Sequence, residues 1–179
     1  TWIRGRGRQG CGRAVTNPPG TMREVDVVLR DGSTVRVRPV RPEDEARYLA
    51  FLRALSEESR AMRYFVPTSE TFLAEEARRE THVDYDQRLG LVATTGVEER
   101  IIGHAIFARR DGDRAEVAVA VADEYQGKGI GTILVGYLAE AAAARGVRVF
   151  EAEVMPANHR MVQLFRESGF PLEVNVKAG

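Results

Sequence analysis

A glycine-rich hexapeptide, Gln126-Gly127-Lys128-Gly129-Ile130-Gly131, constrains the fold of this 179-residue chain more than any other segment. It joins the apolar run 117–121 to the Ala/Leu-rich run 132–145, so it stands between an expected strand and an expected helix. Glycine lets the backbone turn tightly and approach an anion, and a helix N-terminus favours negative charge. The segment therefore predicts a phosphate-binding loop, with Lys128 as an added point charge. The alternative is a glycine-rich turn without a ligand.

The glycine spacing fits neither the Walker loop nor the dinucleotide-binding fingerprint. Gln126, Gly129 and Gly131 instead resemble the Gln/Arg-x-x-Gly-x-Gly/Ala motif of the GNAT acyltransferase superfamily. In that family the motif follows a strand that often carries a catalytic glutamate, and Glu116 precedes the loop here. The family also has an asparagine opening a helix that ends in Gly-Phe, which Asn158 and the later Gly-Phe pair at 169–170 resemble. The resemblance covers roughly residues 90–172.

The N-terminal part is similar to bacterial GNAT domains that acylate protein lysines. The similarity lies in residues 29–32, 38–44, 55–59 and 63–65. These domains are often fused to an acyl-CoA synthetase-like or a cyclic-nucleotide-binding domain. The resemblance implies acetyl-CoA as co-substrate, a protein lysine (for example of an acyl-CoA synthetase) as acceptor, and a covalent fusion in the full-length protein.

Charge and composition exclude several other classes. Lys and Arg together number 26, and Asp and Glu together also number 26. The chain therefore has no overall electrostatic field that favours nucleic acid or an anionic membrane. Apolar runs stay short of the roughly 20 residues that span a bilayer, and no signal peptide is visible, so we expect a cytoplasmic protein. Cys11 is the only cysteine and is expected to be inert. His82, His104 and His159 lack metal-site spacing, so we expect no metal.

The chain is expected to hold one domain. Residues 1–22 are rich in Gly, Arg and Pro and predict a disordered tail or linker. Residues 23–179 form the expected GNAT domain, excised from a longer chain and lacking the last strand of the family.

Hydrophobic patterning predicts the elements of this domain. Expected strands cover residues 25–29, 34–38, 89–95, 101–109, 114–121, 147–154 and 172–176, and the first two form a hairpin around Asp31-Gly32. A helix after Pro42 is expected to bury Ala46, Leu49, Leu52 and Leu55, and further helices cover 57–64, 72–80, 129–145 and 160–168. Strands 114–121 and 147–154 should be parallel neighbours. The expected fold is α/β, with a mixed, mostly antiparallel central sheet, helices on both faces, and the GNAT acyl-CoA N-acyltransferase topology.

The resemblance implies where acyl-CoA would bind. In the GNAT fold the two parallel strands splay apart, so the pantetheine arm can pair with the open backbone of the first strand, while the pyrophosphate lies on loop amides. Asn158 could hydrogen-bond the pantetheine arm or only cap its helix. The expected cofactor-binding residues are Val119, Ala120, Val121, Gln126, Gly127, Lys128, Gly129, Ile130, Gly131, Thr132 and Asn158.

Glu116 is the expected general base. A lysine amine has a pKa of about 10.4, so it must lose a proton before it attacks a thioester. Glu116, Ala118 and Ala120 share one strand face, and the alanines leave space toward the loop. The alternative is a solvated Glu116 paired with Arg114. Weaker candidates for the base are Asp123, Glu124, Glu151 and Glu153.

The general acid is left open. Many GNAT enzymes have a tyrosine where Phe165 stands, so solvent, Tyr125 or Tyr137 would have to protonate the CoA thiolate. Three functions compete: acetyl transfer to a protein lysine, the same chemistry on a small-molecule amine, and a non-catalytic acyl-CoA-sensing module that needs the loop but not Glu116.

Overall fold

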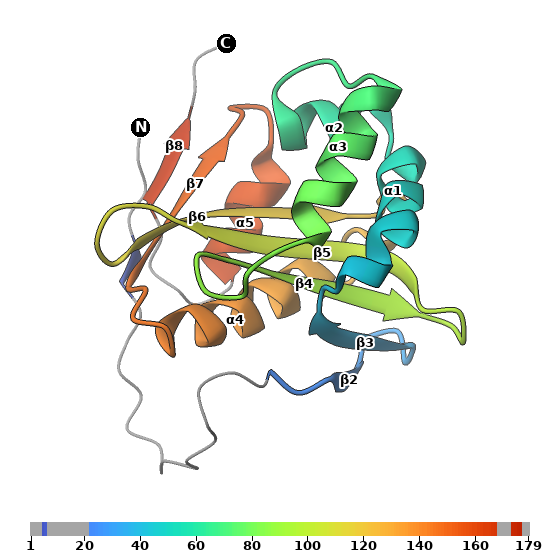
Figure 1. The fold of residues 1–179 in the computed structure, drawn as a ribbon, viewed down its shortest axis with the longest axis horizontal. Helices are drawn as coiled ribbons and strands as arrows, with labels where there is room; N and C mark the ends of the chain where they lie inside the picture. The colour runs from blue at the N-terminus through green and yellow to red at the C-terminus, as the bar shows by residue number, and fades with distance from the viewer. Residues whose placement is uncertain (1–4, 7–21, 168–172, 177–179) are drawn as a thin grey trace.

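The computed structural model describes residues 5–6, 22–167 and 173–176, which build one twisted sheet with helices on both faces (Figure 1). Within these ranges the sheet has eight strands in the order β1-β7-β6-β5-β4-β3-β2, with β8 also on β7. The strands are β1 (Gly5–Arg6), β2 (Val25–Val28), β3 (Thr34–Pro39), β4 (Arg88–Thr95), β5 (Arg100–Arg109), β6 (Arg114–Val121), β7 (Val149–Val154) and β8 (Glu173–Val176). All pairings from β2 to β6 are antiparallel, while β6–β7 and β7–β8 are parallel. The predicted fold class is confirmed.

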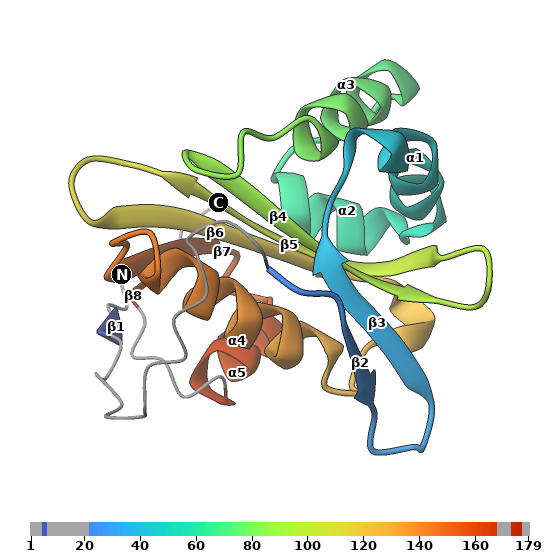
Figure 2. The same cartoon turned by 60° about the horizontal axis from the view of Figure 1, so that its bottom comes forward.

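The helices form two groups. Helices α1 (Glu45–Ala54), α2 (Glu57–Tyr64) and α3 (Glu70–Thr81) cover one face, and α4 (Ile130–Ala143) and α5 (His159–Glu167) cover the other (Figures 1 and 2). Short 3-10 turns, η1 (Pro42–Asp44) and η2 (Asp123–Tyr125), precede α1 and the glycine loop. None of the helices described is both long and apolar enough to cross a bilayer.

Most predicted boundaries agree with the structure to within two residues. The β2–β3 hairpin turns at Gly32, whose φ is +83°, and Gly146 has a φ of +80° just after α4, as expected for glycine at a left-handed position. The parallel pairing of β6 with β7 is confirmed. Gly169 and Leu172, the predicted ends of α5 and of the last strand, lie outside the described residues, as do residues 1–4 and 7–21 of the predicted tail.

The predicted buried face of α1 is wrong in part. Tyr48, Phe51 and Leu52 are its buried residues, whereas Ala46 is exposed and Leu49 is half-buried. Spacing of three residues advances 300° around a helix, so a strict run of such steps drifts off any one face. The aromatic pair, at the i and i+3 positions, marks the side that packs on the sheet.

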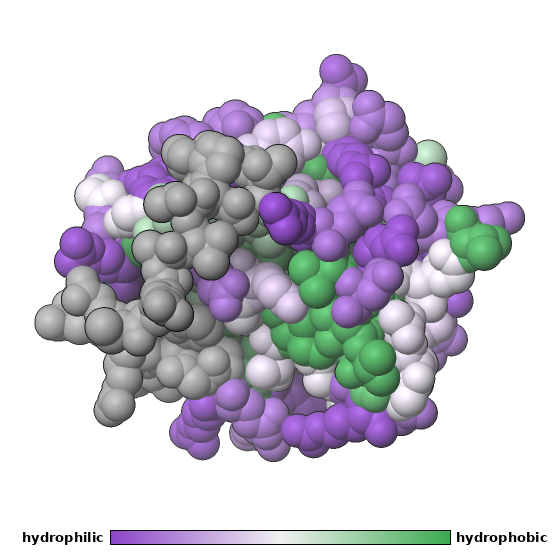
Figure 3. Space-filling view, turned by 90° about the horizontal axis from the view of Figure 1, so that it is seen from below, coloured by the Kyte–Doolittle hydropathy of each residue, from purple (hydrophilic) through white to green (hydrophobic). Residues whose placement is uncertain are grey.

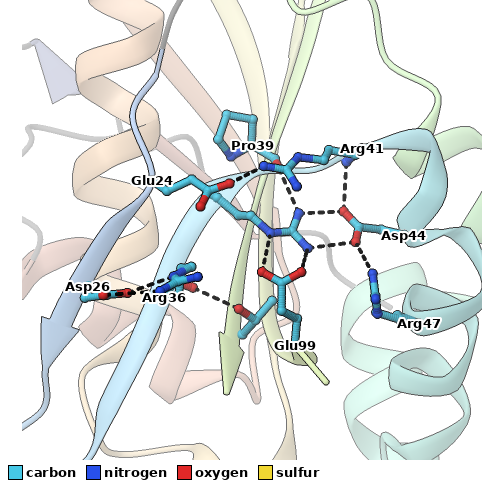
Figure 4. A network of polar contacts seen from close by, with 10 residues as sticks. Glu24, Asp26, Arg36, Pro39, Arg41, Asp44, Arg47 and Glu99 are labelled. Carbon is cyan, nitrogen blue, oxygen red and sulfur yellow. Dashed lines mark hydrogen bonds and ion pairs between the residues drawn. The ribbon is translucent and has the colours of Figure 1, made fainter. Parts of the chain in front are cut away.

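A buried guanidinium joins β3, the start of α1 and the β4–β5 turn (Figure 4). The fully buried Arg38 donates to both oxygens of Asp44 at 2.7 and 2.8 Å and lies 3.4 Å from Glu99. Burial alone would raise the pKa of Asp44, but the hydrogen bonds from Arg38 and from the Arg41 amide hold that pKa below its ordinary value. This cluster fixes the hairpin against the helical face.

Candidate functional site

Strands β6 and β7 diverge after a short paired stretch. They pair in parallel only from Arg114 opposite Val149 to Glu116 opposite Glu151. Beyond that point β6 pairs with β5 alone among the described strands, up to Val121. The backbone edge of β6 that faces β7 is therefore open, and the predicted splay is confirmed.

A groove of about 1390 Å³ lies along this open edge. Its lining comes from the end of β6, the glycine loop, the start of α4, and helices α2 and α5, with hairpin residues 28–30 as a further part. Every residue predicted to bind the cofactor lines it. The structure thus brings together Val119, Ala120, Val121, Gln126, Gly127, Lys128, Gly129, Ile130, Gly131, Thr132 and Asn158.

The three glycines of the loop have different roles. Gly127 and Gly129 adopt φ values of +78° and +87°, and a Cβ on either would have no atom within 4 Å. Gly131 has no such φ, but a Cβ there would lie 2.3 Å from Cδ1 of Leu164 on α5. Two glycines therefore shape the loop beside open space, whereas Gly131 lets α5 pack closely on α4, a role that the loop pattern did not predict.

The N-terminus of α4 offers free backbone donors. No side chain caps it, and the first recorded amide donor in this turn is Ile133, which bonds to the Gly129 carbonyl at 3.0 Å. The preceding N–H groups have no intrahelical acceptor by helix geometry, and their residues line the groove. Such amides, together with the helix dipole, suit a phosphate.

Gln126 has a supporting role that sequence reasoning missed. Its amide nitrogen donates to the Val121 carbonyl at 3.1 Å and lies 3.3 Å from the Ser59 hydroxyl, while its oxygen accepts from Arg160 at 2.6 Å. The side chain therefore ties the loop to β6, α2 and α5. Asp123 strengthens the link to α2, because it accepts hydrogen bonds from Ser56 and Ser59.

Lys128 is already engaged in the structure. Its ammonium lies 3.1 Å from Asp31 of the β2–β3 hairpin and 5.1 Å from the centre of the Tyr125 ring. Hydrogen bonds from Ser33, and then from Lys128, lower the pKa of Asp31 to about 2. The loop lysine is thus paired with a hairpin carboxylate.

Glu116 lies in a small pocket of about 50 Å³, at the end of the groove that lies away from the glycine loop. The lining includes Arg63, Phe65, Glu116, Asn158 and Phe165, and Arg63 and Asn158 also line the large groove. The two spaces are therefore neighbours that share walls.

The ion pairs of β6 differ from the predicted alternative. Glu116 pairs with Arg110, and its side chain is 39% exposed, while Arg114 pairs with Glu151 across the strands. Pairing of Glu116 with Arg114 is thus wrong, because cross-strand neighbours are closer than side chains two positions apart on one strand.

Asn158 caps α5 as predicted. Its Oδ1 accepts a hydrogen bond from the Met161 amide at 3.1 Å, and the residue is only 9% exposed. Phe165 is buried at the small pocket, and of the two tyrosines considered as general acids only Tyr125 lines the groove among the described residues.

Arg63 is a second residue that sequence reasoning missed. It pairs at 3.3 Å with Glu80, a carboxylate that is 1% exposed and lies 3.8 Å from His104. Burial lowers the pKa of His104 to about 4, and the ring packs edge-on against Tyr48 and lies 2.9 Å from its hydroxyl, as expected for a core histidine. Nothing in the local pattern around residue 63 signals a partner on another helix.

Among the described residues, no three His, Cys, Asp or Glu side chains gather as a metal site requires.

Residues 51–170 match the family model described as the Acetyltransferase (GNAT) family. The chain belongs to this family. It is therefore an acyltransferase, of a family that uses acetyl-CoA. The predicted family and enzyme class are confirmed.

Two similar acetyltransferases cover about four fifths of this chain. Acetyltransferase Pat of Mycolicibacterium smegmatis is 34% identical over 147 residues, which are 81% of this chain and 44% of Pat. An acetyltransferase of Pseudomonas aeruginosa is 32% identical over 145 residues, which are 79% of this chain and 77% of that protein. The chain thus spans less than half the length of Pat.

Solved structures agree. The GNAT domain of S. lividans PAT has 37% identity and a TM-score of 0.75, covering 84% of this chain and 95% of that domain. A cAMP-binding acyltransferase from Mycobacterium smegmatis has 30% identity and a TM-score of 0.59, covering 87% of this chain and 48% of that protein.

Proposed function

We propose that the chain transfers an acetyl group from acetyl-CoA to the ε-amine of a protein lysine. One observation carries this proposal: the pocket of Glu116 shares walls with a groove that leads along the open edge of β6 to the glycine loop. A donor with its phosphates on the loop and its pantetheine arm along β6 would place its thioester beside the carboxylate. The likeness to proteins named Pat supports a protein acceptor.

The residues fit the donor in shape and in bonding. Strand β6 rises about 3.3 Å per residue, so the five steps from Glu116 to Val121 span roughly 17 Å. The backbone groups along residues 119–120 on this open edge can pair with the amides of pantetheine as a strand would, while the Val121 carbonyl already accepts a hydrogen bond from Gln126. The amides at the start of α4 suit the pyrophosphate.

Glu116 then acts as the general base. It takes a proton from the lysine ammonium, directly or through water, and the free amine attacks the thioester carbonyl carbon. The new C–N bond forms as the C–S bond breaks, the attacking nitrogen gives up its second proton to solvent to become the amide N–H, and the CoA thiolate takes up a proton. The buried Phe165 has no proton to give, so the thiolate proton comes from solvent or from Tyr125, which lines the groove.

The relatives also bear on the wider protein. Both Pat and the cAMP-binding acyltransferase are more than twice as long as the part that this chain matches. We propose that this GNAT unit, residues 23–179, works in the cytoplasm and is covalently joined to a further domain.

The substitution Glu116→Gln tests the catalytic part. It keeps the side-chain shape and removes the base, so the rate of acetyl transfer at neutral pH should fall by about 10²–10⁴. Transfer is followed by mass spectrometry on a lysine-bearing acceptor protein, and the loss should shrink at higher pH as free amine becomes more abundant. Glu124→Gln, which changes an exposed carboxylate paired with Arg100, is the matched control.

Three outcomes separate the candidates. A variant as active as the parent across the pH range would show that Glu116 is structural. Acetylation of small amines but of no protein would favour the small-molecule enzyme. Acetyl-CoA binding without any turnover would favour a sensing module.

A further inference from the structure

The β2–β3 hairpin meets the glycine loop at the end of the groove that lies away from Glu116. Asp31, in the hairpin turn, lies 3.1 Å from the ammonium of Lys128 in the loop. Val28 at the end of β2, and Leu29 and Arg30 in the turn, line the groove. The hairpin is therefore part of the groove wall, although no loop motif extends to it.

Arg30 differs from the other cationic side chains of the groove. Lys128 pairs with Asp31, Arg63 with Glu80, and Arg160 donates to the side-chain oxygen of Gln126. Arg30 is exposed, and the part of the chain that the structure describes gives it no ion-pair partner. A free guanidinium beside a phosphate loop suits a further phosphate.

The order of chemical groups along the CoA molecule indicates which of its phosphates would lie near Arg30. If the thioester lies at Glu116 and the pyrophosphate at the loop, the next groups along the molecule are the 3′-phosphorylated ribose and the adenine ring. These groups would reach the side of the loop where the hairpin lies.

The apolar surface there fits the adenine. Seen from below, hydrophobic side chains gather on the face that carries β2 and α4 (Figure 3). Val28 is 70% exposed, and the partly buried Ile133 lines the same groove. A flat base could cover both side chains while its ribose phosphate stays at the charged turn.

We propose that the β2–β3 hairpin recognises the 3′-phosphate of CoA, with Arg30 as its ligand and Lys128 as a second cation released from Asp31. This inference rests on the proposed function, because it takes the direction of the bound donor from it. Asp31 then opposes binding, since its carboxylate competes with the phosphate for Lys128.

Calorimetric titration of the 179-residue chain with CoA and with dephospho-CoA, which lacks only the 3′-phosphate, tests the proposal. Wild type should bind CoA about tenfold more tightly than dephospho-CoA. Arg30→Gln should lower CoA affinity by about that factor and leave dephospho-CoA affinity unchanged. Arg36→Gln, which removes the same charge from the same hairpin but where the side chain pairs with Asp26, should retain the preference.

A second variant tests the counterion. Asp31→Asn should raise CoA affinity by a few-fold at low salt, and the gain should shrink at high salt, because exposed charges are screened. Equal affinities of wild type for CoA and dephospho-CoA, or an unchanged preference in Arg30→Gln, would overturn the inference and leave the proposed function standing. If wild type bound neither compound, the proposed function would fail first and the inference with it.

Discussion

At the residue scale, glycine has two different roles in the same loop. Gly127 and Gly129 supply left-handed backbone beside open space, and Gly131 supplies closeness to Leu164. Sequence spacing predicts where these glycines stand but not which role each has, since that depends on a helix more than 30 positions further along the chain. Variants at the three positions should therefore fail in different ways.

Gly129→Val should abolish measurable CoA binding while the fold survives. A β-branched residue is strained at a φ of +87°, and its side chain would enter the open space beside the loop. Titration calorimetry gives the affinity and circular dichroism the folded state. Gly136→Ala is the control, because a Cβ at this helical position meets nothing within 4 Å and alanine favours helix by up to about 1 kcal/mol. Unchanged CoA affinity in Gly129→Val would contradict the loop assignment.

At the scale of elements, sequence patterning predicts what alternation and capping determine. Residues 114–119 alternate in burial as their pattern requires, and α2 begins after Ser56, whose hydroxyl caps it. What patterning misses are contacts between distant elements. Asp123 holds the start of α2 from 64 to 67 positions away, and Arg63 meets Glu80 on the next helix. A single polar residue has no period, so its partner emerges only from the folded chain.

The buried cluster of Arg38, Asp44 and Glu99 is a contact between distant elements of this kind. Asp44→Asn should lower the free energy of unfolding by about 3–5 kcal/mol at pH 7. The reason is that the substitution leaves the buried Arg38 guanidinium with only part of its counter-charge. The pKa of Asp44 is lowered by folding, so its contribution is present above the unfolded value near 3.8 and is lost as pH falls below it.

Urea unfolding at several pH values measures this effect. The difference between wild type and Asp44→Asn should narrow below about pH 4. Asp26→Asn breaks an exposed pair on the neighbouring strand and should cost at most about 1 kcal/mol. A difference for Asp44→Asn no larger than that of Asp26→Asn would refute a stabilising role for the buried cluster.

At the scale of the whole molecule, the groove gathers residues that are far apart in sequence. Its lining extends from Val28 in β2 to Glu167 at the end of α5, and α2 and the loop lie between them in the chain. A ligand in this groove would contact both faces of the sheet at once. Binding should therefore stabilise the fold as a unit.

CoA at about 100 times its dissociation constant should add about 2.7 kcal/mol of stability, which corresponds to a rise in Tm of roughly 5–10 °C for a chain of this size. Thermal unfolding with and without CoA measures the shift. Glu116→Gln should show the full shift, because its groove and loop are intact, whereas Gly129→Val should show none. Equal rises in Tm in these two variants would show that CoA does not depend on the glycine loop for binding.

The open edge of β6 has a consequence beyond catalysis. Unsatisfied N–H and C=O groups in mid-sheet form a template on which a strand of any other molecule could pair, including a second copy of the same protein. The pantetheine arm would occupy that template, so we expect a bound acyl donor to shield the domain from self-association as well. We expect the solubility of this domain to follow the supply of CoA, and a cell depleted of CoA to lose the enzyme to aggregation as well as to lack of substrate.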